Sequence, residues 1–375
     1  MSLWRLHPHT LTFCRSDSKG ARLRQALNAA LKELGELIAR DPWSILNESE
    51  LQALLQFSLL KALPQRPLLS LGSGLLNRRA TTSYSSRRVY RELKVSSGRA
   101  SLEADLVILH DAPQLLQPKA NGAPSRFRVP YAAIVETKID ATPAEILAGS
   151  AGRRLSPDVL SRDLAKWPVG EIADEVWSLV YTSHPEWYAG IKGVITVRRP
   201  QKTIREPLPN RDASFAAAHT FDQAVKELHL QHRAEPFWFL REKDFETELF
   251  IALRRAVGME GHGLNPVRTQ WFSTHSQLLA RRRRHDLVVL ADQPGKLLLE
   301  LELKTSHSDT HNWFRKSDVA AEYAAMQMLK GSGHLERAVF TLFRYGAERW
   351  MEDAQALSLL HPEVELSYWC TEPPR

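Results

Sequence analysis

Two neighbouring stretches of this 375-residue chain decide how it folds: HDLVVL at residues 285–290 and LLLELELKTS at residues 297–306. Short apolar runs of this kind, bounded by turn residues, are typical of buried strands. A hairpin around Gly295 would set the two strands side by side. We therefore expect a sheet of buried strands in the C-terminal half of the chain.

The second of these strands carries charged residues on one face. Side chains alternate between the two faces of a strand, so Glu300, Glu302 and Lys304 share one face, opposite a row of leucines. Asp286 opens the preceding strand, and the hairpin brings it close to Glu302 and Lys304. Two carboxylates can hold a hard divalent cation such as Mg²⁺ or Mn²⁺. The cation and the lysine can together activate a water for attack on a phosphodiester.

The N-terminal half contains the same set, in EADLVILHD (residues 103–111) and YAAIVETKID (residues 131–140). Asp105 begins one strand, and Glu136 and Lys138 share a face of the next. The Asp-to-Glu separation is 136 − 105 = 31 here and 302 − 286 = 16 in the second half. A Pro/Ala/Gly-rich insertion at 112–128 accounts for the difference, and a loop can absorb it at little entropic cost.

The two halves also share an order of predicted elements: helix, three strands, helix, strand. The periodicity predicts helices over 22–40, 48–63, 157–167, 215–230, 244–257 and 317–329, and strands over 88–95, 104–109, 131–139, 177–181, 193–197, 267–272, 286–290, 297–303 and 338–343. We interpret residues 68–88 as a loop or a ragged hairpin. An α/β domain used twice is the natural architecture for this order.

Length and composition agree with this division. At 375 residues, 43% hydrophobic and 25% charged, the chain fits two or three globular domains and neither a disordered nor a fibrous protein. We place an N-terminal domain with a helical extension at 1–200, a linker with a bridging helix at 201–236, and a C-terminal domain at 237–375. Two cysteines and the lack of a signal peptide or an apolar run of membrane-spanning length predict a cytoplasmic protein without membrane contact.

Further candidate site residues come from charge. The net charge of +7 suggests a polyanionic partner. The residues predicted to contact phosphates are Arg87, Arg88, Arg281, Arg282, Arg283 and Arg284. An acid on each opening helix could reach the metal; Glu50 and Glu246 are the first choices, and Glu48 and Glu248 compete with them.

The arrangement resembles the PD-(D/E)XK, or restriction-endonuclease-like, superfamily of nucleases. The matching residues are Glu50, Asp105, Glu136, Thr137 and Lys138 in the first half, and Glu246, Asp286, Glu302, Leu303 and Lys304 in the second. The resemblance covers roughly 45–200 and 237–345. It implies two tandem domains, each a mixed sheet flanked by helices with an αβββαβ core, and Mg²⁺- or Mn²⁺-dependent hydrolysis of phosphodiester bonds.

Two details bear on this resemblance. The family's proline before the first aspartate is absent, since Ala104 and His285 stand there. Many relatives carry a Gln or Lys on the helix after the motif strand, and Lys166 and Gln327 occupy plausible places.

The resulting hypothesis is a metal-dependent nuclease that hydrolyses DNA phosphodiester bonds, which we expect to be an endonuclease, in phage defence, restriction or DNA processing. Nothing in the sequence separates DNA from RNA as the substrate. The alternative is a scaffold that keeps the nuclease fold to bind DNA or a protein partner, with one or both sites idle.

Overall fold

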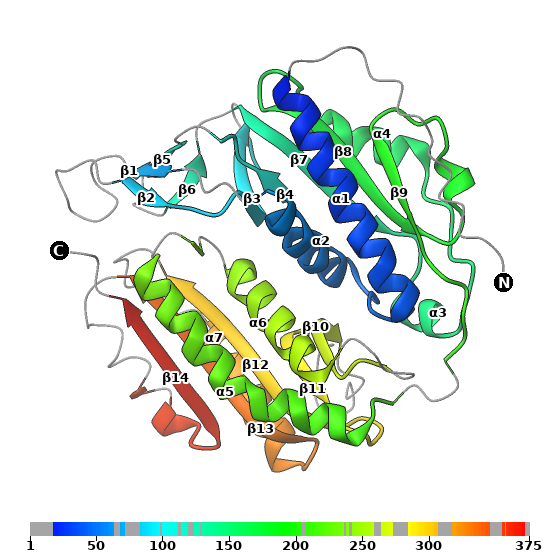
Figure 1. Cartoon of the computed structure of the whole chain (residues 1–375). Helices are drawn as coiled ribbons and strands as arrows, with labels where there is room; N and C mark the ends of the chain where they lie inside the picture. The colour runs from blue at the N-terminus through cyan, green and yellow to red at the C-terminus, as the bar shows by residue number, and fades with distance from the viewer. Residues whose placement is uncertain are drawn as a thin grey trace.

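The computed structural model describes residues 18–63, 68–71, 83–97, 100–111, 114–118, 124–127, 130–204, 208–235, 238–239, 242–258, 264–272, 284–306, 317–345, 355–356 and 358–371. The chain is an α/β protein with two five-stranded mixed sheets flanked by helices (Figure 1). None of the helices described is both long and apolar enough to cross a membrane.

The first sheet has the strand order β3-β4-β7-β8-β9. Its strands are Val89–Ser97, Ala100–Ile108, Tyr131–Ile139, Ala173–Thr182 and Val194–Arg198. β3, β4 and β7 are antiparallel, whereas β7, β8 and β9 are parallel. Helices α1 (Ser18–Arg40) and α2 (Glu48–Ala62) pack on one face, and α4 (Pro157–Ala165) connects β7 to β8 across the other.

The second sheet has the order β10-β11-β12-β13-β14 and the same directions, antiparallel for three strands and then parallel. Its strands are Val267–Phe272, Arg284–Leu290, Leu297–Ser306, Leu335–Tyr345 and Val364–Thr371. Helix α6 (Glu242–Val257) precedes the sheet, and α7 (Ser317–Gly331) connects β12 to β13. The repeated order of elements predicted from the sequence is therefore confirmed, with β14 added at the edge.

A small third sheet contains the segment expected as a loop or a ragged hairpin and the segment expected as a loop. β1 (Leu68–Leu71), β2 (Ser83–Ser85), β5 (Gln114–Pro118) and β6 (Pro124–Phe127) make a separate sheet in the order β2-β1-β5-β6. The alternative of a ragged hairpin at 68–88 is confirmed, since β1 and β2 pair antiparallel. The interpretation of 112–128 as a loop was wrong for β5 and β6, because strands of four or five residues are too short to show an alternating pattern. Helix α3 (Pro143–Leu147) and the 3₁₀ turn η1 (Pro185–Tyr188) were missed because four or five residues are too few to show a helical period.

The helix predicted within the linker is α5 (Arg211–Ala234). Its apolar face, which includes Phe221 and Leu228, belongs to the same core as Leu249 of α6 and Leu299 of β12. It thus packs beside α6 as α1 packs beside α2 (Figure 1).

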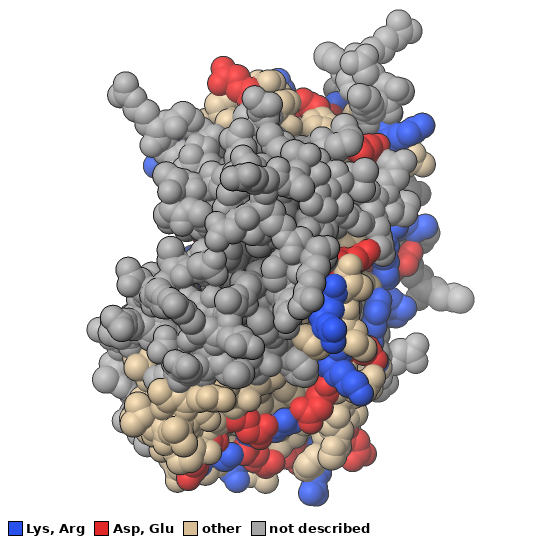
Figure 2. Space-filling view, turned by 90° about the vertical axis from the view of Figure 1, so that its left-hand side faces the viewer, with Lys and Arg blue, Asp and Glu red and all other residues tan. Residues whose placement is uncertain are grey.

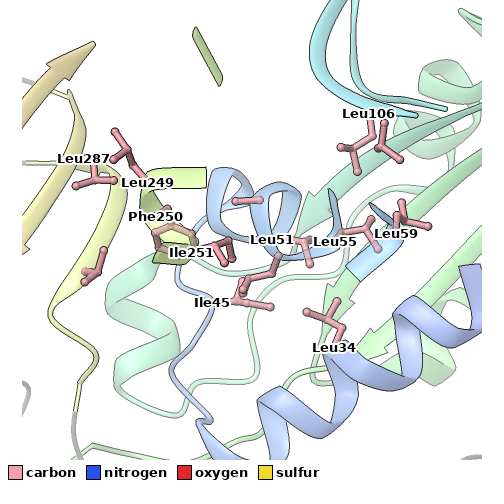
Figure 3. Close-up of a cluster of buried hydrophobic side chains, with 14 of the residues drawn as sticks. Leu34, Ile45, Leu51, Leu55, Leu59, Leu106, Leu249, Phe250, Ile251 and Leu287 are labelled. Carbon is pink, nitrogen blue, oxygen red and sulfur yellow. The ribbon is translucent and has the colours of Figure 1, made fainter. Parts of the chain in front are cut away.

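One apolar core joins the two halves. Helices α2 and α6 lie next to each other between the two sheets (Figure 1). Leu51 and Leu55 of α2 and Leu249 and Phe250 of α6 belong to one buried cluster, shown in Figure 3. Each buried side chain of this size contributes about 1.5–3 kcal/mol to the stability of the fold. The packing of α2 against α6 therefore holds the two sheets in a fixed relation.

Candidate functional site

In the first half, the candidate site is built where β4 and β7 lie side by side. The backbone N–H of Thr137 donates a 2.7 Å hydrogen bond to Oδ2 of Asp105, and the Thr137 hydroxyl donates a second of 3.0 Å. These bonds fix the aspartate beside Glu136 and Lys138, which project from β7 on either side of Thr137 in the sequence. Within the part of the chain described, the other oxygen of Asp105, Oδ1, takes part in no hydrogen bond or ion pair.

Lys138 lies among acids. Its Nζ is 3.9 Å from Oδ2 of Asp105 and 3.6 Å from Oδ2 of Asp163 on α4. Burial opposes the charge on Lys138, but Asp105 and Glu48 outweigh it and raise the lysine pKa. The side chain is therefore an ammonium ion at neutral pH, which can position a water molecule but cannot take its proton.

Asp105, Glu136 and Lys138 form what we call the first group, and the pKa of Glu136 is strongly raised within it. Its Oε1 accepts a 3.0 Å hydrogen bond from the indole N–H of Trp167. Burial, and then the neighbouring charge of Asp105, raises the pKa of Glu136 to about 7. Two carboxylates that repel one another in this way, with oxygen donors only, fit a hard divalent cation.

The second half places its three motif residues in the same relation. The backbone N–H of Leu303 donates a 3.1 Å hydrogen bond to Oδ2 of Asp286, which matches the Thr137 bond to Asp105. Nζ of Lys304 lies 3.6 Å from both Asp286 Oδ2 and Glu302 Oε2. The same ammonium is 3.5 Å from Oε2 of Glu322 on α7, a residue that takes the place of Asp163.

Asp286, Glu302 and Lys304 form the second group, where the charges of buried acids and lysines act on one another's pKa values. Burial opposes ionisation of Asp286, but Lys304 and Lys243 outweigh it and lower the aspartate pKa. Burial raises the pKa of Glu242 to about 8, although Lys304 opposes this shift. Burial also opposes the charge on Lys304, and its carboxylate neighbours, led by Asp286 and Glu242, overcome it and raise the lysine pKa.

One difference separates the two groups. In the second, Oδ1 of Asp286 accepts a 3.0 Å hydrogen bond from Gln270 and lies 3.8 Å from Nζ of Lys243, the second residue of α6. The second residue of α2 is Ser49, which has no charge. Both oxygens of Asp286 are thus engaged, whereas Oδ1 of Asp105 is not.

The opening-helix acids require a correction. Glu50 is fully buried and accepts hydrogen bonds from Leu46 N at 2.7 Å and Arg268 at 3.2 Å, away from Asp105. Its competitor Glu48, the first residue of α2, is the acid close enough for its charge to act on Lys138. Burial raises the Glu48 pKa, and Lys138 opposes that shift.

The second opening helix behaves similarly. Glu242, the first residue of α6, lies 3.7 Å from Nζ of Lys304. Glu246 reaches Asp286 only through Gln270, which donates to both carboxylates at 3.0 Å. Glu248 pairs instead with Arg87. Glu242 escaped prediction because the expected helix began two residues later; Asp163 and Glu322 carry no motif that would have identified them.

Strained backbone marks both groups. Among the described residues other than glycine, the positive φ angles are 47° at Glu92 and 52° at Gln270. The flanking strand pairs place Glu92 opposite Asp105 and Gln270 opposite Asp286. Such a conformation costs about 1–3 kcal/mol, persists only where surrounding structure enforces it, and clusters at functional sites.

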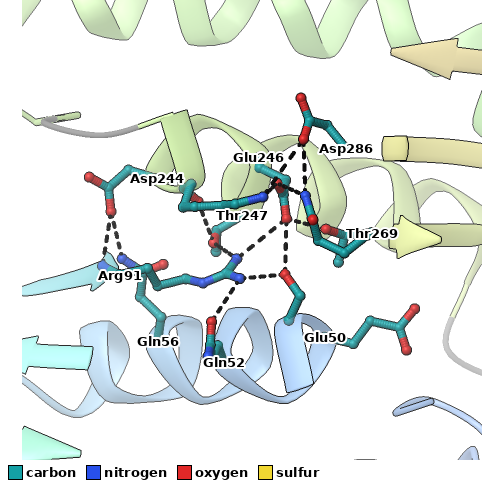
Figure 4. A network of polar contacts seen from close by, with 12 residues as sticks. Glu50, Gln52, Gln56, Arg91, Asp244, Glu246, Thr247, Thr269 and Asp286 are labelled. Atoms are coloured by element: carbon teal, nitrogen blue, oxygen red, sulfur yellow. Dashed lines mark hydrogen bonds and ion pairs between the residues drawn. The ribbon is translucent and has the colours of Figure 1, made fainter. Parts of the chain in front are cut away.

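A chain of hydrogen bonds connects the two groups through the interface of α2 and α6, and Figure 4 shows the part of it that runs from Gln52 to Asp286. From Asp105 it runs through Thr137, Gln52, Arg91, Ser49, Glu246 and Gln270 to Asp286, with donor–acceptor distances of 2.6–3.2 Å. Arg91, which is fully buried, stands at its centre and also donates to Thr247 at 2.8 Å. The two aspartates are therefore parts of one polar network.

Two of the arginines predicted to bind phosphates, Arg87 and Arg88, are buried and do not lie on the surface. Arg87 is buried and pairs with Asp244 at 3.5 Å and with Glu248; Arg88 is 9% exposed and pairs with Asp111 at 2.5 Å. Both arginines pair with acids of the protein itself, which corrects their assignment as phosphate-binding residues. Arg284 is exposed at the start of β11, whereas Arg281, Arg282 and Arg283 lie outside the described residues.

The exposed charges of one face are mixed. On the face in Figure 2, the described Lys and Arg side chains are interspersed with Asp and Glu.

Lys166 caps α4 and pairs with Asp163. Gln327 contacts His361. Of these two helix residues, only Lys166 has a charge that acts on the first group, where it lowers the pKa of Glu136 against the larger effect of burial.

No protein-family model matches this chain, and neither the curated proteins nor the solved structures gave a significant match. The candidate function therefore depends on the geometry of the two groups.

Proposed function

We propose that this protein is a metal-dependent nuclease built from two restriction-endonuclease-like units. One observation supports this above all: aspartate, glutamate and lysine converge at the same strands of both sheets, with the same amide-to-aspartate hydrogen bond in each. A solvated charged face would explain one such group, but it would not reproduce the bond, the strained residue opposite and the helix-borne acids twice.

In the first unit, Asp105 and Glu136 would hold Mg²⁺ or Mn²⁺, with Glu48 as the nearby helix acid. The bound cation would lower the pKa of a water molecule and stabilise charge on a phosphoryl oxygen. Lys138, held as an ammonium ion by its acidic neighbours, orients the attacking water and stabilises the negative charge that develops on the phosphate. Glu302, Asp286 and Lys304 are the corresponding residues of the second unit.

We assign cleavage mainly to the first unit. A metal-binding aspartate needs an oxygen that is open to the cation, and Oδ1 of Asp105 meets that requirement. In the second unit the ammonium of Lys243 already neutralises Oδ1 of Asp286. This favours a second unit that no longer cuts, as in the scaffold alternative, while the first remains an enzyme acting on DNA or RNA in defence or nucleic-acid processing.

The test is cleavage by the purified protein of supercoiled plasmid, linear DNA and single-stranded RNA, each with Mg²⁺, Mn²⁺ or EDTA. We expect cleavage that EDTA abolishes. The double variant Asp105→Asn/Glu136→Gln should lose it, because amides replace both charged ligands while the fold keeps its shape. Full activity in EDTA, or in the double variant, would overturn the proposal.

A second expectation concerns pH. Since the pKa of Glu136 is raised to about 7, a proton competes with the cation below that pH. The Mg²⁺ affinity of the first unit should therefore rise about tenfold per pH unit up to about pH 7 and level off above it. Calorimetric titration of Asp286→Asn/Glu302→Gln, which leaves only the first group, measures this. An affinity that does not change with pH would contradict the assignment of Glu136.

A further inference from the structure

The second unit contains a buried group that its counterpart lacks. His285 on β11 and Glu300 and Glu302 on β12 place ligand atoms within 4.8 Å of one another, and all three residues are at most 2% exposed. Nδ1 of His285 lies 2.8 Å from Oε1 of Glu300. Ligand atoms around one metal at about 2.0–2.2 Å lie about 3–4 Å apart, so small side-chain rotations would bring these three together.

The first unit supplies a matched comparison. Its residue before the strand aspartate is Ala104, and its residue two before the motif glutamate is Ile134; both are fully buried in an apolar cluster. The second unit has His285 and Glu300 at these positions, also fully buried. Burying an ionisable pair where a hydrophobic pair fits costs stability, so the exchange requires another reason.

The histidine supplies an independent observation that points to a ligand. Within the part of the chain described, Nε2 of His285 is buried and has no hydrogen-bond partner. An unsatisfied buried nitrogen costs about 1–3 kcal/mol, and coordination or a rearranged hydrogen bond on metal binding would remove that cost. An imidazole next to carboxylates suits zinc, cobalt or manganese better than Mg²⁺.

We propose that His285, Glu300 and Glu302 form a site for a first-row transition metal, separate in ligand chemistry from the all-oxygen site of the first unit. Glu302 is shared with the motif of the second unit, where it lies 3.6 Å from Lys304. The proposal therefore rests on the proposed function and gives the second unit a different cation from the first. The site explains how the second unit can retain a metal although Lys243 occupies the neighbourhood of Asp286.

The experiment is titration of the metal-free protein with Co²⁺, followed by visible absorption and calorimetry without nucleic acid. Wild type should bind Co²⁺ with an absorption band that reports nitrogen ligation. His285→Ala/Glu300→Ile, which installs the first unit's residues, should bind it at least about 100-fold more weakly, since loss of outer-shell partners alone costs about 10–100-fold. Asp105→Asn/Glu136→Gln is the matched control and should keep the band.

Folding is checked by the melting curve of each variant without metal. Should the double variant fail to fold, Glu300→Gln, which keeps the shape, takes its place and should weaken Co²⁺ binding and remove the rise in melting temperature that Co²⁺ gives wild type. An unchanged Co²⁺ spectrum and affinity in a folded variant, or no Co²⁺ binding by wild type, would overturn this site. Neither result bears on cleavage with Mg²⁺, which tests the proposed function separately.

Discussion

Lys138→Ala should lower the rate of plasmid cleavage by about 10²–10³-fold, the usual cost of removing one preorganised charge from the transition state. The ammonium is held between Asp105 and Asp163, and its raised pKa keeps it charged throughout the neutral range. Its removal takes away the positive charge beside the phosphate while leaving Asp105 and Glu136 to hold the cation. Binding of Mg²⁺ should therefore persist in this variant although cleavage is lost.

Lys304→Ala is the matched substitution in the second unit. If cleavage belongs to the first unit, this variant should retain most of the wild-type rate. Lys32→Ala provides a second control, because Lys32 on α1 is exposed and its ion pair with Glu36 lies at the surface. The rates are measured from supercoiled, nicked and linear plasmid resolved over time.

Three patterns distinguish the arrangements of the sites. Loss in Lys138→Ala alone supports a single cutting unit. Nicked circles from each single variant, with linear product from wild type, would show that both units cut, one strand each. Complete loss of cleavage in both variants would contradict independent sites and indicate one interdependent centre. The hydrogen-bond chain from Asp105 to Asp286 would then be the physical connection between the two sites.

The fold could be predicted to the extent that its strands are long and buried. HDLVVL is a short apolar run and LLLELELKTS alternates strictly, both of which are typical of strands, and β11 and β12 formed there. The hairpin alternative at 68–88 anticipated the pairing of β1 and β2, but β5 and β6 could not be found, since four or five residues leave no period to detect. Local pattern thus determined the two large sheets but not the small one.

The motif residues could be predicted from alternation, because Glu136 and Lys138 must share a face of β7. The helix acids could not, since a shift of two residues turns a helix by about 200° and so exchanges Glu50 for Glu48 at the site. The structure selects the first residue of each helix, Glu48 and Glu242, and turns Glu50 toward Arg268. Which face of α2 meets the sheet depends on the packing of α6 against it, and no local pattern contains that information.

The same packing explains the arginines. Arg87 and Arg88 stand in a basic stretch that the sequence alone associates with phosphates, yet both are buried. Arg87 pairs with Asp244 and Glu248, which lie on a helix more than 150 residues away in the chain. A partner so distant cannot be anticipated from the sequence around the arginine.

Arg91→Ala should destabilise the protein by about 3–5 kcal/mol, the range expected when one partner of a buried charged network is removed. Arg91 joins the two units: it donates to Ser49 at 2.6 Å and Gln52 at 3.1 Å on α2, and to Thr247 on α6. Its loss leaves Glu246, 3.8 Å away and 1% exposed, with less positive charge to balance it. Urea unfolding of wild type and variant measures the difference in free energy of unfolding.

Arg337→Ala is the control for this change. Arg337 also makes several ion pairs, with Asp222 and Glu365, but its side chain is 30% exposed and water can replace them. Exposed pairs contribute about 0–1 kcal/mol, so this variant should unfold almost like wild type. Equal destabilisation by the two substitutions would show that the buried network at the α2–α6 interface does not hold the units together.

Hydrogen exchange adds a readout that global stability does not give. The amides of Thr137 and Leu303 donate to Asp105 and Asp286, at the two ends of the chain of bonds that passes through Arg91. If that chain holds both aspartates in place, the two amides should exchange faster in Arg91→Ala under native conditions, while core amides of β8 and β13 keep their protection. Faster exchange at only one of the two would mean that Arg91 supports a single site, and that the sites are positioned independently of each other.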